Sequence, residues 1–439
     1  SNFVYLTGFE EPDAVCVMAP GHPDGEYVLF VRPRDPEMES WNGYRAGVEG
    51  AKERHGADAA HDISELDEVL TRMMLGRSVL WYRVGNPSHD ARVSGLVGKA
   101  RAYRDRFGRA APEAVRDVSD AIGHMRLRKS AEEIESLRAA CLLSTEGHRE
   151  AMRFARPGLY EYQIEAAMEY VWREGGSRRN GYPSIVASGP NNCILHYVEN
   201  DRLVEDGDLI LIDAAAEIDH YSSDITRTFP ANGTFTAPQR ALYEVVEDAQ
   251  RRAIATARPG NTIADIHDTA TRALTEGLVD LRLLPKDVDE ALAMHHYRQF
   301  FFHGTSHWLG LDVHDRGTYR IEGESRPLGP GMVLTVEPGL YLDANKPVRS
   351  FAMLEYDLDR WTEERILEGR AARLRQEELL EEAEQLEFEL PPEFVGLGIR
   401  IEDDILIVDG GHDNLTSHVP VEIDDIEELC AETSWLVRE

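Results

Sequence analysis

Short apolar runs and amphipathic stretches alternate along the first 124 residues. Residues 15–18, 27–31 and 78–82 are apolar and rich in β-branched or aromatic side chains, which predicts strands. Residues 63–75 carry apolar positions near helical spacing, and Ser64 is a candidate N-cap for this helix. This alternation predicts an α/β domain, and no cluster of residues typical of a catalytic site falls within it.

A second region begins at a strong helix start. Ser130 is followed three residues later by Glu133, which is the spacing of a capping box, and the predicted helix runs to about residue 154. Beyond it, Ala-Arg-Pro-Gly occurs at 155–158 and again at 257–260. Each copy follows a long predicted helix and precedes another, and these second helices are expected to end near residues 174 and 276. We therefore predict a domain boundary at 124/125, followed by two related half-domains.

One stretch, from about 352 to 392, does not follow the repeat. It is rich in Glu and Arg, and its apolar residues Leu379, Ala383, Leu386 and Leu390 have a 4-3-4 spacing. We predict a charged helical insertion there. An intersubunit interface or a solvated surface element is favoured over a lid.

Composition limits the classes of partner. The 439 residues are 42% apolar and 29% charged, as in folded proteins, and the net charge of -33 argues against a nucleic-acid or anionic-membrane partner. The cysteines are scattered, so neither a disulfide framework nor a structural zinc site is predicted; they are Cys16, Cys141, Cys193 and Cys430. Without a signal peptide or a run of about 18 apolar residues, we expect a cytoplasmic protein.

Asp213 and Asp224 are predicted to lie on one β-hairpin. Residues 209–214 are expected to form the first strand, 217–219 the turn and 220–229 the return strand. Side chains on facing strands approach within about 5 Å on one face, which suits two ligands of one cluster.

Two more acids have similar surroundings. Glu337 ends one apolar run and Glu402 lies within another. Asp213 and Glu337 each lie six residues after a glycine that begins a predicted strand, so a pseudo-twofold axis would bring them together. Carboxylates that face a core are costly unless they are paired or bind a cation, and converging carboxylates repel one another. We therefore predict a metal centre of a hydrolase.

The candidate ligand set is rich in oxygen. It consists of Asp213, Asp224, His307, Glu337 and Glu402. Such a set favours Mn²⁺, Co²⁺, Fe²⁺ or Mg²⁺, whereas structural zinc prefers Cys and His. Four negative ligands balance two divalent ions, and a water between two such ions ionises near neutral pH to give a hydroxide nucleophile.

Several other histidines require separate interpretation. His303 and His307 have the i, i+4 spacing of a zincin helix, but Gly304 stands where that motif needs Glu and disfavours a helix interior, so we reject that interpretation. His196 and His314 are candidates for substrate contacts. For both, a buried structural histidine is the alternative.

Three further side chains complete the candidate site. Arg400 lies two residues before Glu402, so it is predicted to share a strand face with it and to orient carboxylates. Trp41 and Tyr341 are candidate aromatic residues of a substrate pocket. For either aromatic residue alone, core packing is the favoured alternative.

Long motifs make the chain similar to a known family. Tyr-Leu-Thr-Gly-Phe-Glu-Glu-Pro begins at residue 5, Asp-Ile-Thr-Arg-Thr-Phe-Pro at 224, His-Gly-Thr-Ser-His-Trp-Leu-Gly at 303 and Gly-Ile-Arg-Ile-Glu-Asp-Asp at 398. In these motifs, and over nearly its whole length, the chain resembles aminopeptidase P, the Xaa-Pro aminopeptidases of the creatinase or "pita-bread" metallopeptidases. The Ser-His-Trp-Leu-Gly run is more like aminopeptidase P than like prolidase or methionine aminopeptidase.

The resemblance implies an α/β (α+β) architecture of two domains. Residues 1–124 would form a creatinase-like N-terminal domain that is truncated at its start, and 125–439 a pita-bread catalytic domain with pseudo-twofold symmetry. Relatives form dimers and tetramers, so a homo-oligomer is expected. Trp41 would then line a pocket, either of its own subunit or of a neighbouring one.

The resemblance also implies roles for single residues. All five candidate ligands match positions that hold two metal ions, usually manganese, with cobalt, iron or zinc as alternatives. Glu337 would also carry a proton from the nucleophile to the leaving proline nitrogen, and Arg400 would support the ligands. The substrate and the developing oxyanion would be surrounded by His196, His303 and His314.

The function that these expectations describe is hydrolysis of the bond between an N-terminal residue and a following proline. Two alternatives remain open. The first is a prolidase that acts only on dipeptides. The second is a metal-free binding module on the same fold, against which the presence of all five ligands argues.

Overall fold

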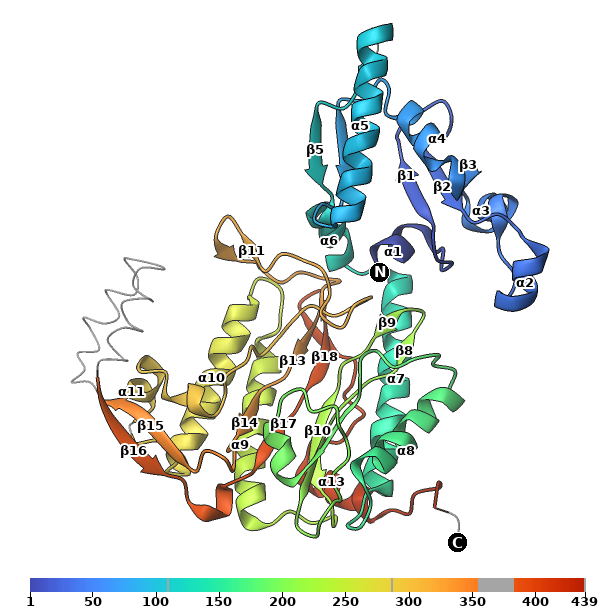
Figure 1. The fold of residues 1–439 in the computed structure, drawn as a ribbon. Coiled ribbons are helices and arrows are strands. Elements are labelled where there is room, and N and C mark those ends of the chain that lie inside the picture. Colours follow the sequence, from blue (N-terminus) through green and yellow to red (C-terminus); the bar gives the residue numbers. More distant parts are fainter. Residues whose placement is uncertain (109, 286, 354–382, 438–439) are drawn as a thin grey trace. The chain divides into compact units, whose positions relative to one another are not determined.

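The computed structural model describes residues 1–108, 110–285, 287–353 and 383–437. The chain divides into two compact units, Ser1–Met125 and Arg126–Glu439 (Figure 1). The candidate ligands all belong to the second unit.

The first unit is an α/β assembly of two small sheets. In one sheet β1 runs antiparallel to β2, which is parallel to β3, and in the other β4 is parallel to β5. The strands are β1 (Val15–Met18), β2 (Tyr27–Val31), β3 (Ala59–Asp62), β4 (Val79–Tyr82) and β5 (Ala114–Asp117). The helices are α1 (Asn2–Thr7), α2 (Pro36–Asn42), α3 (Gly47–His55), η1 (Ile63–Glu65), α4 (Leu66–Met73), α5 (Pro87–Phe107) and α6 (Ser119–Leu127), the last of which continues to the start of the second unit.

The expected helix over 63–75 begins differently from the prediction. Its first turn is the 3₁₀ segment η1, and α4 follows it. The Asp62 carboxylate accepts a hydrogen bond from the Ser64 amide, so Asp62 caps the segment and the prediction for Ser64 was wrong. Asp62 directly precedes the first turn, so its carboxylate reaches the free amide of Ser64. Ser64 lies inside the turn and not at its start.

The second unit contains two helix pairs on either side of a central group of strands (Figure 1). The pairs are α7 (Ala131–Phe154) with α8 (Glu161–Glu174), and α9 (Ala237–Thr256) with α10 (Ile263–Asp280). The predicted capping box is present at α7, where Ser130 and Glu133 each bond the other's amide. Helix α10 ends at Asp280, four residues beyond the end that was expected near Glu276.

The repeated sequence corresponds to repeated structure. Gly158 and Gly260, which end the two Ala-Arg-Pro-Gly copies, have φ values of +90° and +91°, a conformation that other residues rarely adopt. Strands β7 (Leu209–Asp213) and β13 (Val333–Val336) each follow a glycine with φ of +86° or +84°. The two halves of the unit therefore present equivalent strands.

The central strands form several small antiparallel sheets. Strand order is β10-β7-β6 in one sheet and β13-β18-β19 in another, while β14 pairs with β17. These strands are β6 (Ile185–Ser188), β10 (Thr226–Pro230), β14 (Gly339–Tyr341), β17 (Gly398–Arg400), β18 (Asp403–Val408) and β19 (Gly411–Asn414). The remaining elements are η2 (Gly189–Cys193), β8 (Glu217–Ile218), β9 (Tyr221–Ser222), α11 (Val288–Ala293), η3 (His296–Gln299), β11 (Arg320–Ile321), β12 (Glu324–Ser325), β15 (Val348–Met353), β16 (Glu384–Glu389), η4 (Pro392–Phe394) and α13 (Ile423–Ala431).

The hairpin predicted for Asp213 and Asp224 is interrupted. Asp213 lies opposite Thr226 in the β7–β10 ladder, as a hairpin requires. The tip of this hairpin is formed by the separate β8–β9 pair. That pair turns through Asp219 and His220, whose φ values are +49° and +71°. The predicted continuous return strand over 220–229 was therefore wrong. Asp224 lies between β9 and β10.

The predicted helical insertion is also corrected in part. Leu386 lies in strand β16 and pairs with Phe351 of β15, so residues 384–389 are not helical. Pairing with β15 outweighs the local helical spacing of the apolar residues. Residues 354–382, which carry the rest of the predicted insertion, lie outside the described residues.

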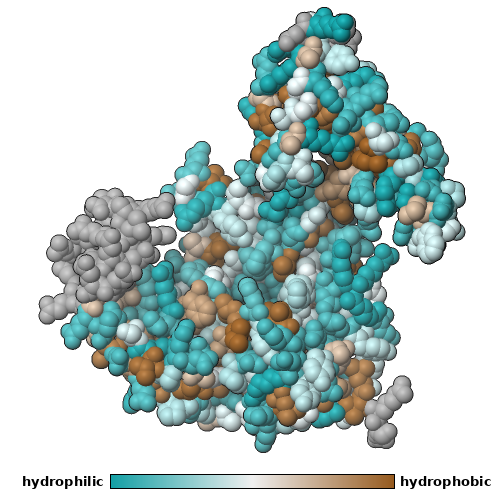
Figure 2. All heavy atoms as spheres, viewed as in Figure 1, coloured by the Kyte–Doolittle hydropathy of each residue, from teal (hydrophilic) through white to brown (hydrophobic). Residues whose placement is uncertain are grey.

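Apolar side chains of the second unit form one large core and several smaller clusters. Trp172 of α8, Phe229 of β10 and Leu274 of α10 belong to the large core and are all 0% exposed. The visible face of this unit is mostly hydrophilic, and its apolar side chains show as separate areas (Figure 2). Of the helices that the structure describes, none is both long enough and apolar enough to cross a membrane.

Candidate metal centre

All five predicted ligands line one cavity of about 580 Å³ in the second unit. Four of them lie at or just beyond the ends of strands, where the sheet ladders stop. Asp213 ends β7, Asp224 lies between β9 and β10, Glu337 between β13 and β14, and Glu402 between β17 and β18. His307 lies on the segment between η3 and β11.

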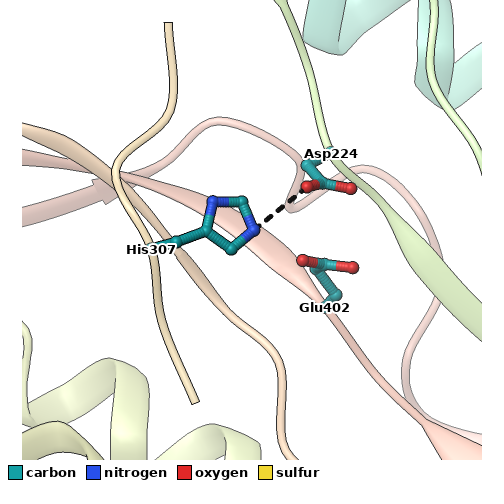
Figure 3. A group of neighbouring side chains, drawn as sticks. All are labelled: Asp224, His307 and Glu402. Atoms are coloured by element: carbon teal, nitrogen blue, oxygen red, sulfur yellow. Dashed lines mark ion pairs between the residues drawn. The ribbon is translucent and has the colours of Figure 1, made fainter. Parts of the chain in front are cut away.

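Three of these side chains are especially close. Asp224, His307 and Glu402 each offer a ligand atom within 4.8 Å of the other two (Figure 3). His307 Nε2 lies 3.3 Å from Asp224 Oδ2 and 3.6 Å from Glu337 Oε1. The other ring nitrogen, Nδ1, lies 3.2 Å from the carbonyl oxygen of Trp308. Donation to that carbonyl would leave Nε2 free to bind a metal, as is usual for ligating histidines.

Arg400 connects two of the acids, Asp213 and Glu402. Its Nη2 donates to Asp213 Oδ2, and its Nε and Nη1 each lie 3.1 Å from the hydroxyl oxygens of Thr226 and Tyr341. The Thr226 hydroxyl in turn donates to Glu402 Oε2 at 2.6 Å. A guanidinium that is 4% exposed therefore orients one acid directly and a second through a threonine.

Two contacts of the acids were missed by sequence reasoning. The phenol oxygen of Tyr182 lies 2.6 Å from Asp213 Oδ1 and 2.5 Å from Asp224 Oδ1. Tyr182 is in a loop before β6, and no sequence spacing relates it to either acid. Thr226 could have been found, because it lies two residues after Asp224 and strand side chains alternate with a period of two.

Burial and crowding raise the pKa values of three carboxyl groups. Burial, followed by repulsion from neighbouring carboxylates, raises the pKa of Glu337 to about 7, although His307 and Arg400 oppose the shift. Burial and the same repulsion raise the pKa of Glu402 well above its usual range. Burial also raises the pKa of Asp213. Divalent cations would relieve this repulsion, so the donor set fits hard metal ions.

The neighbouring carboxylates also shift the pKa of the His307 imidazole. Burial alone would lower its pKa, but the hydrogen bond and negative charge of Asp224, together with Glu337, raise it to about 9. Without cations His307 therefore holds a proton and acts as a partial counterion. A metal ion would replace that proton, since an imidazole ligates in its neutral form.

The pKa of His303 is shifted in the opposite direction. Burial, helped by the charge of Arg400, lowers its pKa to about 3, so the ring is neutral. Nε2 lies 2.9 Å from the Tyr341 hydroxyl and Nδ1 lies 2.8 Å from the Gly304 carbonyl oxygen. A consistent assignment has Arg400 donating to Tyr341, Tyr341 to His303, and His303 to Gly304.

The remaining predicted residues occupy different environments. His196 and His314 line the cavity, and the His314 ring lies 4.2 Å from the His307 ring. Tyr341 is 1% exposed and contacts His303 through its hydroxyl. Trp41 lies in the first unit on α2 and is 82% exposed. Substrate contacts by these residues stay predictions.

Comparisons with known proteins extend over nearly the whole chain. Residues 135–409 match metallopeptidase family M24, and residues 1–81 match the aminopeptidase P N-terminal domain. The chain is 39% identical to the Xaa-Pro aminopeptidase of Escherichia coli, covering 98% of this chain and 88% of the relative. It is 34% identical to human Xaa-Pro aminopeptidase 3, with coverages of 99% and 77%.

Solved structures agree with these relatives. Aminopeptidase PepP of Pseudomonas aeruginosa has a TM-score of 0.86 and 42% identity, covering 98% of this chain and 88% of that one. Zinc-substituted E. coli aminopeptidase P in complex with product has a TM-score of 0.84 and 39% identity, with the same coverages. These similarities include both the N-terminal and the catalytic fold.

Proposed function

The chain belongs to metallopeptidase family M24 and is a metal-dependent aminopeptidase for peptides with proline after the N-terminal residue; we propose that its five clustered acidic and histidine side chains hold two divalent ions for this reaction. The observation that carries the proposal is the convergence of four carboxylates and His307 on one cavity. Without cations, burial and repulsion hold protons on several of these groups. The prolidase alternative is not favoured, because the similar proteins are named as aminopeptidases.

The ions would be held by Asp213, Asp224, His307, Glu337 and Glu402. When bound, two divalent ions supply a hydroxide nucleophile at neutral pH and polarise the scissile carbonyl. We favour Mn²⁺ because four of the five donors are carboxylates. In our proposal Glu337 also delivers a proton to the leaving proline nitrogen. Its Oε2 lies 3.6 Å from His303 Nδ1, at the wall of the cavity.

The rest of the cavity would bind and orient the peptide. His196, His303 and His314 would surround the scissile bond, and Arg400 would hold the ligand carboxylates in place. Proline contributes no backbone N–H, so the site must recognise the ring by shape. Apolar side chains in the cavity lining support this proposal; they are Pro183, Ile185, Leu195, Val198 and Val313.

Metal removal and reloading test the proposed function. Chelated protein is expected to be inactive, and Mn²⁺ should restore cleavage of Ala-Pro-Ala but leave Ala-Ala-Ala uncleaved. Metal content is measured in parallel, and about two ions per chain are expected. Hydrolysis of Ala-Pro without any hydrolysis of Ala-Pro-Ala would instead indicate a dipeptidase, and activity that survives complete chelation would contradict the metal centre.

Metal binding should weaken progressively as the pH falls from about 9, and more steeply below about 7. Burial raises the pKa of Glu337 to about 7 in the metal-free protein, and His307 is also protonated at neutral pH because its pKa is raised to about 9. Metal ions must displace these protons, so lower pH opposes binding. Calorimetric Mn²⁺ titrations between pH 6 and 8, in buffers of different ionisation enthalpy, should show proton release. An affinity that is independent of pH would contradict this coupling.

The proposal also covers where the protein is located and how its chains assemble. The four cysteines are free thiols, which supports a reducing, cytoplasmic location. Trp41 and Tyr44 are 82% and 90% exposed, which supports contact of this surface with another copy of the chain in a homo-oligomer.

A further inference from the structure

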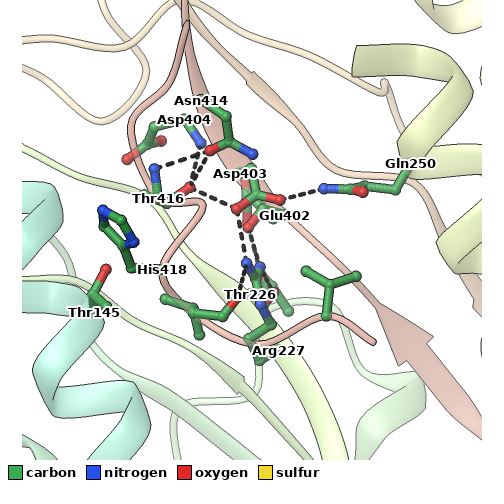
Figure 4. Close-up of polar contacts among 12 residues, drawn as sticks. Thr145, Thr226, Arg227, Gln250, Glu402, Asp403, Asp404, Asn414, Thr416 and His418 are labelled. Atoms are coloured by element: carbon green, nitrogen blue, oxygen red, sulfur yellow. Dashed lines mark hydrogen bonds and ion pairs between the residues drawn. The ribbon is translucent and has the colours of Figure 1, made fainter. Parts of the chain in front are cut away.

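A buried polar cluster adjoins the candidate metal centre and shares Glu402 with it (Figure 4). Its central member is Arg227 of β10, which is 0% exposed. Arg227 directly follows Thr226, whose hydroxyl bonds the Glu402 carboxylate. Burial of a guanidinium is costly unless all of its donors are satisfied, so acceptors for every donor of Arg227 are expected nearby.

Every N–H group of the Arg227 guanidinium has an acceptor. The acceptors are Pro420 O (3.0 Å from Nε), Thr226 O (3.0 Å) and Glu402 O (2.6 Å) for Nη1, and Asp403 Oδ1 (2.8 Å) and Val419 O (3.2 Å) for Nη2. Arginine has five such donors in a planar fork, and here all five are used. Four of the five acceptors are main-chain carbonyls, so Arg227 holds backbone from three separate segments.

The shortest of these bonds joins Arg227 Nη1 to the carbonyl oxygen of Glu402. It holds the main chain of this predicted metal ligand at a position outside the paired strands. Glu402 lies between β17, which pairs with β14, and β18, which pairs with β13. The chain therefore changes partner strands at this residue. The Glu402 amide donates to Thr226 O at 3.0 Å, and its carbonyl accepts from Arg227 Nη1. The main chain of Glu402 is thus attached to β10, the strand that follows Asp224.

The orientation of Arg227 is itself held by Asp403. Asp403 Oδ1 accepts from Arg227 and, at 2.6 Å, from the Thr416 hydroxyl, while its Oδ2 accepts from Gln250 of α9. The two charged side chains of this pair are 0% and 1% exposed. Figure 4 shows Asp403 between these partners, with Arg227 directed toward it. A charge pair so enclosed has one well-defined geometry.

We propose that Arg227 is a positioning residue that sets the distance between the Glu402 and Asp224 carboxylates by holding the Glu402 main chain against β10. This inference rests on the proposed metal centre. Lysine cannot replace arginine here, because an ammonium group has three donors and no fixed fork. Arg227→Lys keeps the charge beside Asp403 but loses the bonds to several carbonyls. Changes in groups that orient metal ligands lower metal affinity by about 10–100-fold, and we expect an effect of that size.

The test titrates metal-free wild type and Arg227→Lys with Mn²⁺ at a temperature at which both are folded. Arg227→Lys should bind more weakly, its Co²⁺-loaded form should have a changed visible absorption spectrum, and excess Mn²⁺ should restore most of the cleavage rate. Arg202→Lys is the matched control. Arg202 pairs with Asp208 in the same unit and bonds the Ser188 hydroxyl, and its variant should bind Mn²⁺ like wild type.

The outcomes separate positioning from general stability. Unchanged Mn²⁺ affinity and an unchanged Co²⁺ spectrum in Arg227→Lys would overturn the inference, whatever free energy of unfolding the variant loses. If Arg227→Lys does not fold, Thr416→Val carries the test, because it removes one donor to Asp403 and should lower affinity several-fold; wild-type affinity there would overturn the inference. Wild type that binds no Mn²⁺ would overturn the metal centre and this inference together.

Discussion

Asp224→Asn is expected to lower kcat/KM on Ala-Pro-Ala by about 10³-fold or more, because it removes the charge of a proposed ligand from the densest part of the centre. Asp224 is 5% exposed, and its carboxylate lies beside His307 Nε2. The amide has nearly the same size but carries no charge. A metal centre contributes several kcal/mol to the transition state, and each 1.4 kcal/mol corresponds to about tenfold in rate. Activity and metal content per chain are measured together.

The same β7–β10 region offers a matched control for this variant. Asp219 occupies the β8–β9 turn with φ of +49°, a conformation that asparagine also tolerates. Asp219→Asn should therefore retain near wild-type activity and metal content. Full activity of Asp224→Asn with normal metal content would contradict the assignment of Asp224 as a ligand.

Arg400→Met should have the second-largest effect, on stability as well as rate. The change removes the cation that bonds Asp213 and leaves that carboxylate buried without its main partner. Breaking a buried pair in this way costs about 3–5 kcal/mol, measured as the free energy of unfolding of the metal-free protein. Activity should fall by about 10²-fold or more, because Thr226 and Tyr341 also lose a donor. Denaturant unfolding without and with Mn²⁺ checks this, and metal should recover part of the loss.

Arg349→Met separates the site effect from the loss of any buried arginine. Arg349 is 3% exposed and stacks over Phe300, but its Nε and Nη2 have no hydrogen-bond partner among the described residues. Its replacement should cost less stability and leave Mn²⁺ affinity unchanged. Equal losses in both variants would contradict a specific role for Arg400 at the centre.

Local sequence was sufficient for most elements of the fold. The Ser130–Glu133 capping box forms because both partners lie within one helical turn. The strands predicted at 15–18 and 27–31 occur as β1 and β2. One prediction was wrong because a distant segment decided the outcome: Leu386 pairs with Phe351 in a sheet in spite of its helical spacing. The Ser64 cap was wrong for a local reason, since Asp62 takes that role.

The candidate site was predictable to a similar extent. The four acids could be selected because each lies in or next to apolar sequence, and together with His307 they line one cavity. Tyr182 could not be selected, since its contact with Asp213 and Asp224 depends on how a loop folds over the strands. The same is true of Arg227, which the pattern shows only as one polar residue in a strand.

The sequence by itself determined the candidate ligand types, their order along the chain and the repeat that places two of them on equivalent strands. These properties follow from spacing and residue chemistry, which are local. Only the tertiary structure decided the pKa values of Glu337 and His307, the links from Arg400 to the acids, and the attachment of Glu402 to β10 through Arg227. Burial, charge repulsion and hydrogen bonding act between atoms that lie close in space, and most of these atoms belong to residues far apart in the chain.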